Sequence, residues 1–158
     1  MHTAFAESSG PVLQTESVAE IESCCGQDLV LIVDAHESSR STLARRVRKQ
    51  GFIALAAGSG AEGLQLARRH RPAAVVVDLC LPDVDGLSLC QELTDGAETC
   101  AIPVIGLNRQ EQPDMLCRAR AAGCHFYLHE PYDPRVLMTL IRQAIDDSVS
   151  WNAGGDWY

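Results

Sequence analysis

The chain has 158 residues, enough for one domain with a substantial core and too few for two. Its formal net charge is −8, but eight of its 21 acids lie in residues 1–28 and 146–158, which contain no Lys or Arg, so the part between is formally neutral. A neutral core argues against a nucleic-acid partner, which needs clustered positive charge. Because the sequence lacks both an apolar run of about 18 residues and a secretory signal, we expect a cytoplasmic protein that does not span a membrane.

The predicted elements follow one another in a regular order. Residues 1–27 are polar and acidic and are predicted to be a disordered leader, or a frayed helix over Thr15–Cys25. Residues 28–147 are predicted to form the domain, and residues 148–158 a tail that ends in aromatic residues. Strands are expected at Leu29–Val33, Phe52–Ala56, Ala74–Val77, Val104–Leu107 and His125–Leu128. Helices are expected near Ser39–Gln50, Ser59–His70, Gly86–Leu93, Glu111–Ala122 and Pro134–Asp146. This alternation predicts an α/β fold with a parallel sheet and right-handed crossovers.

Local signals refine this prediction. Ser59 and Asp133 are expected to cap the helices that follow them, with Pro134 at the first helical position. The seven cysteines show no Cys-x-x-Cys spacing, so most are expected to be small core residues rather than metal ligands. Cys24-Cys25 is the exception, because it lies in the polar leader and is expected to be exposed.

The third strand carries the most informative residue. A continuous apolar run, Ala74–Val77, is typical of a strand buried on both faces, and it ends on Asp78. A charged group at the carboxyl end of a parallel strand lies where open α/β sheets bind their ligands. Asp78 is therefore the first candidate for a functional residue.

Over roughly residues 28–147 the chain resembles the receiver domain of bacterial response regulators. The resemblance is carried by blocks that come in the family's order: Leu29–Asp34, Pro72–Asp78 with Leu81–Gly86, Ile102–Ile105, Ala121–Gly123 and Glu130–Tyr132. It implies a doubly wound, five-stranded parallel sheet of the flavodoxin-like (βα)5 type, with strand order 2-1-3-4-5. It also implies a cis peptide bond between Glu130 and Pro131.

The resemblance further implies a phosphorylation site. Asp78 matches the phosphoacceptor, and Asp34 matches the first of the usual pair of acids that bind Mg²⁺. The backbone carbonyl of Cys80 would be a further metal ligand. Tyr127 matches the aromatic residue that family members often swing inward on activation.

Three positions depart from the family pattern. Ala35 replaces the second metal-binding acid, Asn108 stands where a Ser or Thr hydroxyl contacts the phosphoryl group, and Glu130 stands where a lysine does so. The only lysine, Lys49, is expected at the wrong edge of the sheet, and Arg135 lies inside the last helix, so no cation is expected to replace the missing one. These changes weaken the predicted Mg²⁺ site. Two readings of Glu130 remain open: a third carboxylate beside Asp34 and Asp78 that helps to hold Mg²⁺, or a side chain that points to solvent beside an inactive site.

The first functional hypothesis is a stand-alone receiver domain in a two-component phosphorelay. Its partners would be a sensor histidine kinase or phosphotransfer protein and a downstream protein, bound through the face of the fourth helix, fifth strand and fifth helix. The second is a pseudo-receiver that binds proteins without phosphorylation. A distant third comes from Gly58-Ser-Gly60-Ala-Glu-Gly63, which fits the dinucleotide motif G-x-G-x-x-G. The two preferred hypotheses describe a signalling protein and not an enzyme.

Overall fold

The computed structural model describes residues 28–153, with side chains described as far as residue 149. Its strands are β1 (Leu29–Val33), β2 (Ile53–Ala57), β3 (Ala74–Asp78), β4 (Val104–Asn108) and β5 (Phe126–His129). Its helices are α2 (Glu37–Lys49), α3 (Gly60–His70), α4 (Gly86–Asp95), α5 (Met115–Ala121) and α6 (Pro134–Ala153). The predictions for Thr15–Cys25, including exposure of Cys24-Cys25, lie outside the described residues.

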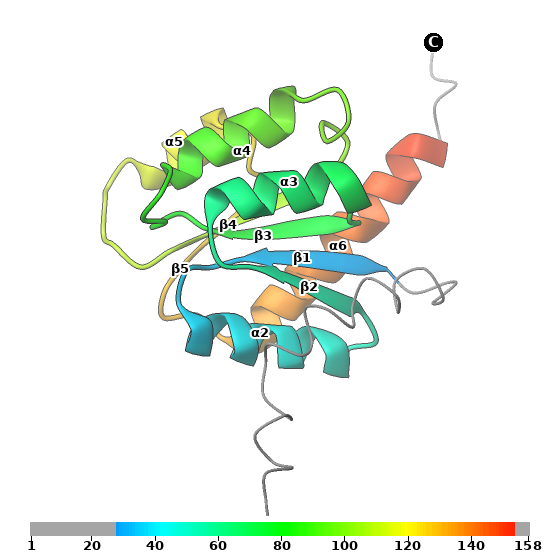
Figure 1. Cartoon of the computed structure of the whole chain (residues 1–158), viewed down its shortest axis with the longest axis horizontal. Helices are drawn as coiled ribbons and strands as arrows, with labels where there is room; N and C mark the ends of the chain where they lie inside the picture. Colours follow the sequence, from blue (N-terminus) through cyan, green and yellow to red (C-terminus); the bar gives the residue numbers. More distant parts are fainter. Residues whose placement is uncertain (1–27, 154–158) are drawn as a thin grey trace, which may run out of the picture.

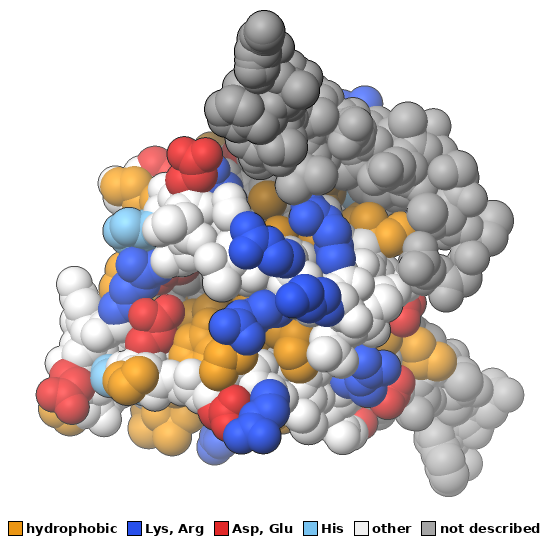
Figure 2. Space-filling model, turned by 90° about the horizontal axis from the view of Figure 1, so that it is seen from below, with side chains coloured by type: hydrophobic (Ala, Val, Ile, Leu, Met, Phe, Trp, Pro, Cys, Tyr) orange, Lys and Arg blue, Asp and Glu red, His pale blue; other side chains and the backbone are white. Residues whose placement is uncertain are grey.

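The predicted sheet topology is confirmed. All four strand pairs are parallel, and the order is β2-β1-β3-β4-β5. Figure 1 shows the three layers: α3, α4 and α5 cover one face of the sheet, and α2 and α6 cover the other. Figure 2 views the molecule from the α2 side. The carboxyl ends of all strands therefore meet at one edge of the sheet, where the connecting loops gather.

The core explains why this sequence folds in layers. Side chains alternate across β1, so that Leu31 packs toward α3 and α4 while Ile32 packs toward α2 and α6. Both are fully buried, as are Val75, Val76 and Val77 of β3. A strand with apolar residues on both faces must be covered on both faces, which is what the flanking helices do.

Most predicted helix boundaries agree with the structure. Ser59 accepts a hydrogen bond from the Glu62 N–H, and Asp133 accepts one from the Arg135 N–H, which confirms both predicted caps. The Glu130–Pro131 peptide bond is cis, as expected. The last helix continues to Ala153 rather than ending at Asp146.

The prediction for α5 was wrong at its start. The helix begins at Met115 rather than at Glu111. Pro113 gives the reason, because a proline disfavours helical backbone in the residue before it. Residues 111–114 are exposed and connect the end of β4 to the helix.

The prediction for the cysteines was correct only in part. Cys90 and Cys124 are buried, with their sulfur atoms 3.5 Å apart. Cys80 is half-buried, whereas Cys100 and Cys117 are exposed. The prediction was wrong for these last two, because Cys100 lies in the loop after α4 and Cys117 on the outer face of α5.

Candidate functional site

Two buried carboxylates lie at the carboxyl edge of the sheet. Asp34 directly follows β1 and Asp78 ends β3, and these two strands are neighbours. Asp34 is 6% exposed and Asp78 is 3% exposed. Asp34 Oδ1 accepts a hydrogen bond from the His36 N–H at 2.9 Å, and Asp78 Oδ1 accepts one from the Cys80 N–H at 3.0 Å. The other oxygen of Asp78, Oδ2, is buried and accepts no hydrogen bond from the described residues.

Burial is the main influence on the charge of Asp78. Removal from water raises the pKa of this carboxyl group above its ordinary value of 3.8, because the charged form loses hydration. The neighbouring carboxylate of Asp34 raises this pKa further, while the Cys80 N–H and the Arg109 guanidinium lower it. The charged form of Asp78 is thus only partly compensated by the groups around it.

Arg109 supplies a cation that the sequence analysis did not expect. Its Nη2 lies 3.2 Å from Asp34 Oδ2 and 3.6 Å from Asp78 Oδ2. Its Nε lies 3.4 Å from Glu130 Oε2. The expectation that no cation stands in for the missing lysine considered Lys49 and Arg135, and it is corrected by Arg109, which brings a cation to the acid pair from the end of β4. A signal was available, since Arg109 directly follows Asn108 at the same edge of the sheet as Asp78.

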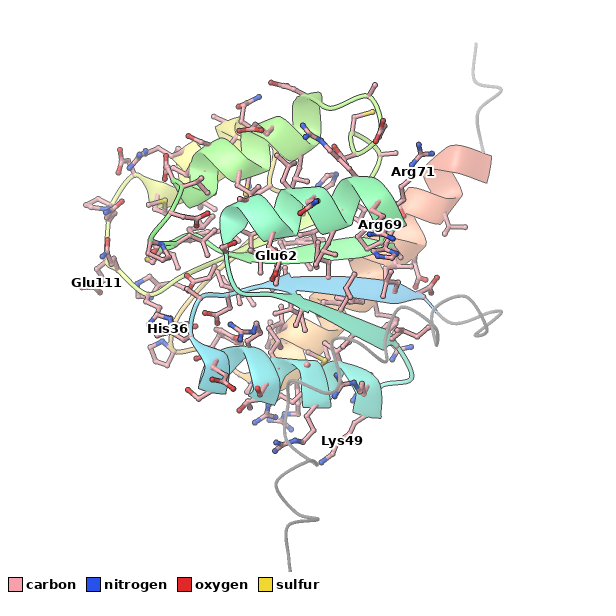
Figure 3. The ribbon with its side chains drawn as sticks, viewed as in Figure 1. His36, Lys49, Glu62, Arg69, Arg71 and Glu111 are labelled. Carbon is pink, nitrogen blue, oxygen red and sulfur yellow. The ribbon has the colours of Figure 1, made fainter. Side chains whose placement is uncertain are left out.

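His36 is a second residue that the sequence analysis missed. Its Nδ1 lies 3.4 Å from Asp34 Oδ1 and 4.0 Å from Asp78 Oδ2, although the side chain is largely exposed. Figure 3 shows His36 in the loop between β1 and α2. The same figure shows Lys49 at the opposite end of α2 from His36, which agrees with its expected position.

Asn108 is buried at the end of β4 and is 1% exposed. Its Nδ2 donates hydrogen bonds to the Gln110 carbonyl at 2.7 Å and to the Tyr127 hydroxyl at 3.2 Å. Its Oδ1 accepts from the Gln110 N–H at 3.2 Å and from Cys80 Sγ at 3.3 Å. The Asn108 amide therefore stabilises the loop after β4 and connects this loop to Tyr127 of β5. In the described part of the chain, no hydrogen bond joins Asn108 to Asp78.

Glu130 follows β5, and its side chain is 33% exposed. Within the described residues it forms an ion pair with Arg109, whose guanidinium also contacts the acid pair. The three groups whose ligand atoms lie within 4.8 Å of one another are Asp34, His36 and Asp78. This arrangement differs from both readings of Glu130, because the side chain neither joins that group nor is free in solvent.

The donor set suits a magnesium ion in part. Mg²⁺ prefers oxygen ligands and keeps several waters, and Asp34, Asp78 and the Cys80 carbonyl would offer such oxygens. The buried Asp78 Oδ2 without a hydrogen-bond donor is the observation that favours a cation here. The Arg109 guanidinium already contacts both carboxylates, so an ion would have to share these oxygens with it.

The glycine-rich loop before α3 has a structural explanation. The N–H groups of Gly60 and Ala61 donate to the Asp83 carboxylate at 3.0 and 3.1 Å, so a protein side chain occupies the place where a phosphate would bind. A Cβ atom at Gly60 would clash with Val84 Cγ2. These contacts favour close packing of α3 over a dinucleotide site.

Sheet topology, buried acid pair and loop geometry together define a receiver-type α/β signalling domain. The family model of the response regulator receiver domain matches residues 30–142. The chain belongs to this family.

Two curated relatives are similar over most of their own length. Protein PilH of Pseudomonas aeruginosa is 32% identical over 116 residues, which are 73% of this chain and 96% of PilH. The polar-differentiation response regulator DivK of Brucella anthropi is 32% identical over 112 residues, which are 70% of this chain and 91% of DivK.

Two solved structures share the fold. A CheY-like receiver domain of Methanospirillum hungatei has a TM-score of 0.74 at 20% identity and covers 79% of this chain and 98% of its own. A chemotaxis response regulator of Vibrio cholerae has a TM-score of 0.69 at 21% identity and covers 75% of this chain and 98% of its own. Within the described residues, no helix combines the length and the apolar character needed to cross a bilayer.

Proposed function

We propose that this protein is a phosphorylation switch in which Asp78 accepts a phosphoryl group. The observation that carries the proposal is Asp78 Oδ2, a buried carboxylate oxygen without a hydrogen-bond donor, at the sheet edge where parallel α/β folds bind ligands. An oxygen held in this way is available to form a new bond. Burial raises the pKa of Asp78, so its carboxylate is more basic than an exposed one, and the negative charge that a phosphoryl group adds must be neutralised by neighbouring groups.

The reaction is transfer from a phosphohistidine of a sensor kinase or phosphotransfer protein. The Asp78 oxygen forms a P–O bond while the P–N bond of the donor breaks, and the donor nitrogen keeps the electron pair and takes up a proton. Little covalent chemistry is needed from the other residues, which position the groups and stabilise charge.

Arg109 is the residue that we assign to charge stabilisation. Its Nη2 is 3.6 Å from Asp78 Oδ2, so it lies within reach of oxygens added to that carboxylate. It would take the part that a lysine plays in the rest of the family, starting from β4 instead of β5. Glu130 holds the guanidinium on its other side through Nε.

A bound Mg²⁺ would supply further neutralisation of the phosphoryl charge. Asp34, Asp78 and the Cys80 carbonyl would hold the ion, with His36 beside them. Because Ala35 replaces one acid, we expect weaker binding than a site with three carboxylates would give.

Partner binding follows from the same assignment. The downstream partner is proposed to bind the face of α5, β5 and α6. These are the fourth helix, fifth strand and fifth helix of the domain. Large apolar side chains are exposed there, with Leu116 at 50% and Val136 at 44%. The hydrogen bond between the Tyr127 hydroxyl and Asn108 connects this face to the loop beside Asp78. A cytoplasmic location remains part of the proposal.

A second candidate function is a protein-binding module that is not phosphorylated. The observation in its favour is that the Asn108 amide donors are already satisfied by Gln110 and Tyr127. Arg109 also compensates the acid pair without any added ion.

Intact-mass analysis separates the two functions. The protein is incubated with Mg²⁺ and a small phosphodonor such as phosphoramidate, beside the variants Asp78→Asn and Arg109→Gln. One added phosphoryl group is expected on the wild type and none on Asp78→Asn. Loss of one preorganised donor predicts a rate for Arg109→Gln that is lower by roughly 10²–10³-fold. If the wild type gains no phosphoryl group from this donor or from a phosphorylated histidine kinase, the binding module is the better description.

A further inference from the structure

A basic groove runs between α2 and α6, on the face of the sheet opposite α3. Its volume is about 490 Å³. Figure 2 shows Lys and Arg side chains on both sides of an apolar strip on this face. The cations that line the groove are Arg45, Arg46, Lys49, Arg135 and Arg142, and its lining includes no acidic side chain.

Most of this positive charge is not paired. Arg135 forms an exposed ion pair with Asp133, and Arg142 lies over the Phe52 ring at 5.2 Å. Within residues 28–149, Arg45, Arg46 and Lys49 form no ion pair with an acidic side chain. Five of the chain's 13 basic residues therefore gather along one groove of a part of the chain that is neutral as a whole.

The leader, residues 1–27, has the complementary composition. It contains four acids, Glu7, Glu16, Glu20 and Glu22, and no Lys or Arg. It also contains apolar residues beside these acids, such as Val18 and Ile21, which match the apolar floor that Met138 contributes to the groove.

The leader is attached close to one end of the groove. The carbonyl of Asp28 accepts a hydrogen bond from the Ile53 N–H, and Ile53 is only a few residues beyond Lys49 and Gln50 of the groove lining. A helix of the length of α2 spans about 20 Å, whereas 27 extended residues span up to about 90 Å. The tether is thus long enough to reach every part of the groove.

We propose that the acidic leader of this chain binds in the basic groove between α2 and α6. The groove also adjoins the pocket of Asp34 and Glu130, since Thr42, Arg46 and Pro134 line both. The binding itself does not depend on phosphorylation of Asp78.

Paramagnetic broadening in the full chain tests the proposal. A nitroxide is placed at residue 17 through Ser17→Cys, in a background in which Cys24, Cys25, Cys100 and Cys117 are changed to serine. The amide signals of Thr139 and Arg142 on α6 are expected to lose more than half their intensity at low salt. They should recover in 0.5 M NaCl, because exposed ion pairs are screened at that ionic strength.

Matched charge reversals locate the contact. Arg45→Glu with Arg46→Glu should abolish the broadening, whereas Arg68→Glu with Arg69→Glu, on α3 at the other face of the sheet, should leave it unchanged. Broadening that is confined to residues near Asp28, or that is insensitive to salt, overturns the proposal. A mixed sample gives the second control: spin-labelled protein without ¹⁵N is combined with ¹⁵N-labelled protein without a spin label. Equal broadening in this mixture would also overturn the proposal, because the leader of a second copy would then occupy the groove. Should the reversed variant fail to fold, the salt dependence of the unreversed chain decides.

Discussion

Replacement of Arg109 by glutamine is the sharpest test of how the acid pair is held. The side chain keeps much of its length and can still donate hydrogen bonds, so the change removes mainly the positive charge. In the native protein this charge lies 3.2 Å from Asp34 Oδ2 and 3.6 Å from Asp78 Oδ2, and both carboxylates are almost completely buried. Without it, two buried carboxylates lie side by side with their repulsion uncompensated.

The loss of unfolding free energy in Arg109→Gln has an upper bound, because the acid pair can take up one proton instead of remaining doubly charged. Protonation of a carboxyl group with the ordinary pKa of 3.8 costs about 4 kcal/mol at pH 7 and about 1.6 kcal/mol at pH 5, at 1.36 kcal/mol for each pH unit. The variant is therefore expected to lose about 2–4 kcal/mol of unfolding free energy at pH 7. Its native state binds more protons than its unfolded state, so the loss shrinks as the pH falls and disappears below pH 3.8.

Urea unfolding followed by circular dichroism, with a chelator present and at several pH values, measures this loss. Arg135→Gln is the matched control, since Arg135 is 91% exposed and its pair with Asp133 is solvated; its unfolding free energy should stay unchanged within error. Arg109→Gln combined with Asp78→Asn should recover most of the stability, because one of the two repelling charges is gone. An unfolding free energy for Arg109→Gln that equals the wild type at pH 7, or the same loss at pH 5 as at pH 7, would refute the argument.

Three further outcomes are expected. Asp78→Asn should raise the unfolding free energy by about 1–3 kcal/mol at pH 7, because the pKa of Asp78 is raised and its charged form therefore destabilises the fold. Thermal melts at several pH values should show that this gain in stability vanishes below pH 3.8. Gly63→Ala should cost about 1–3 kcal/mol in urea unfolding, since the new Cβ atom would come 2.7 Å from Val33 Cγ2. Val33→Ala in the same chain should recover part of that cost, and additive losses would contradict this packing argument. Asp83→Asn should lower the melting temperature at neutral pH, because the N–H groups of Gly60 and Ala61 lower the pKa of Asp83. The difference in melting temperature from the wild type should disappear as the pH falls through that lowered pKa. A difference that stays constant down to pH 2 would contradict this prediction.

The fold was predictable because its main signals are local and agree with one another. The apolar run that ends at Asp78, the cap at Ser59 and the Asp133-Pro134 start each predict the same alternation of strand and helix. Buried strands also leave few alternatives, since a run that is apolar on both faces must be covered on both sides. The strand order required the family resemblance, because pairing of distant strands leaves no local trace in the sequence.

The site was predictable only where backbone position fixes the side chain. Asp34 and Asp78 end neighbouring strands, so their proximity follows from topology. Arg109 was missed because an arginine side chain reaches several ångströms from its Cα, so its position in the sequence does not show which groups its guanidinium contacts. His36 was missed for the opposite reason: it lies in a loop, and only the three-dimensional turn after Asp34 brings it to the acids.

The arrangement of charge also bears on whether the site is active. The Arg109 guanidinium contacts Asp34, Asp78 and Glu130 together. It therefore compensates the charge of the unphosphorylated acids and would also have to compensate the charge of an added phosphoryl group. A cation shared in this way lowers the need for Mg²⁺ in the resting state, and it must loosen its contact with Asp34 or Glu130 to follow a phosphoryl oxygen. Mg²⁺ should therefore bind more tightly to Arg109→Gln than to the wild type, and an isothermal titration in which the two affinities are equal would show that the guanidinium and the ion do not compete for the same oxygens.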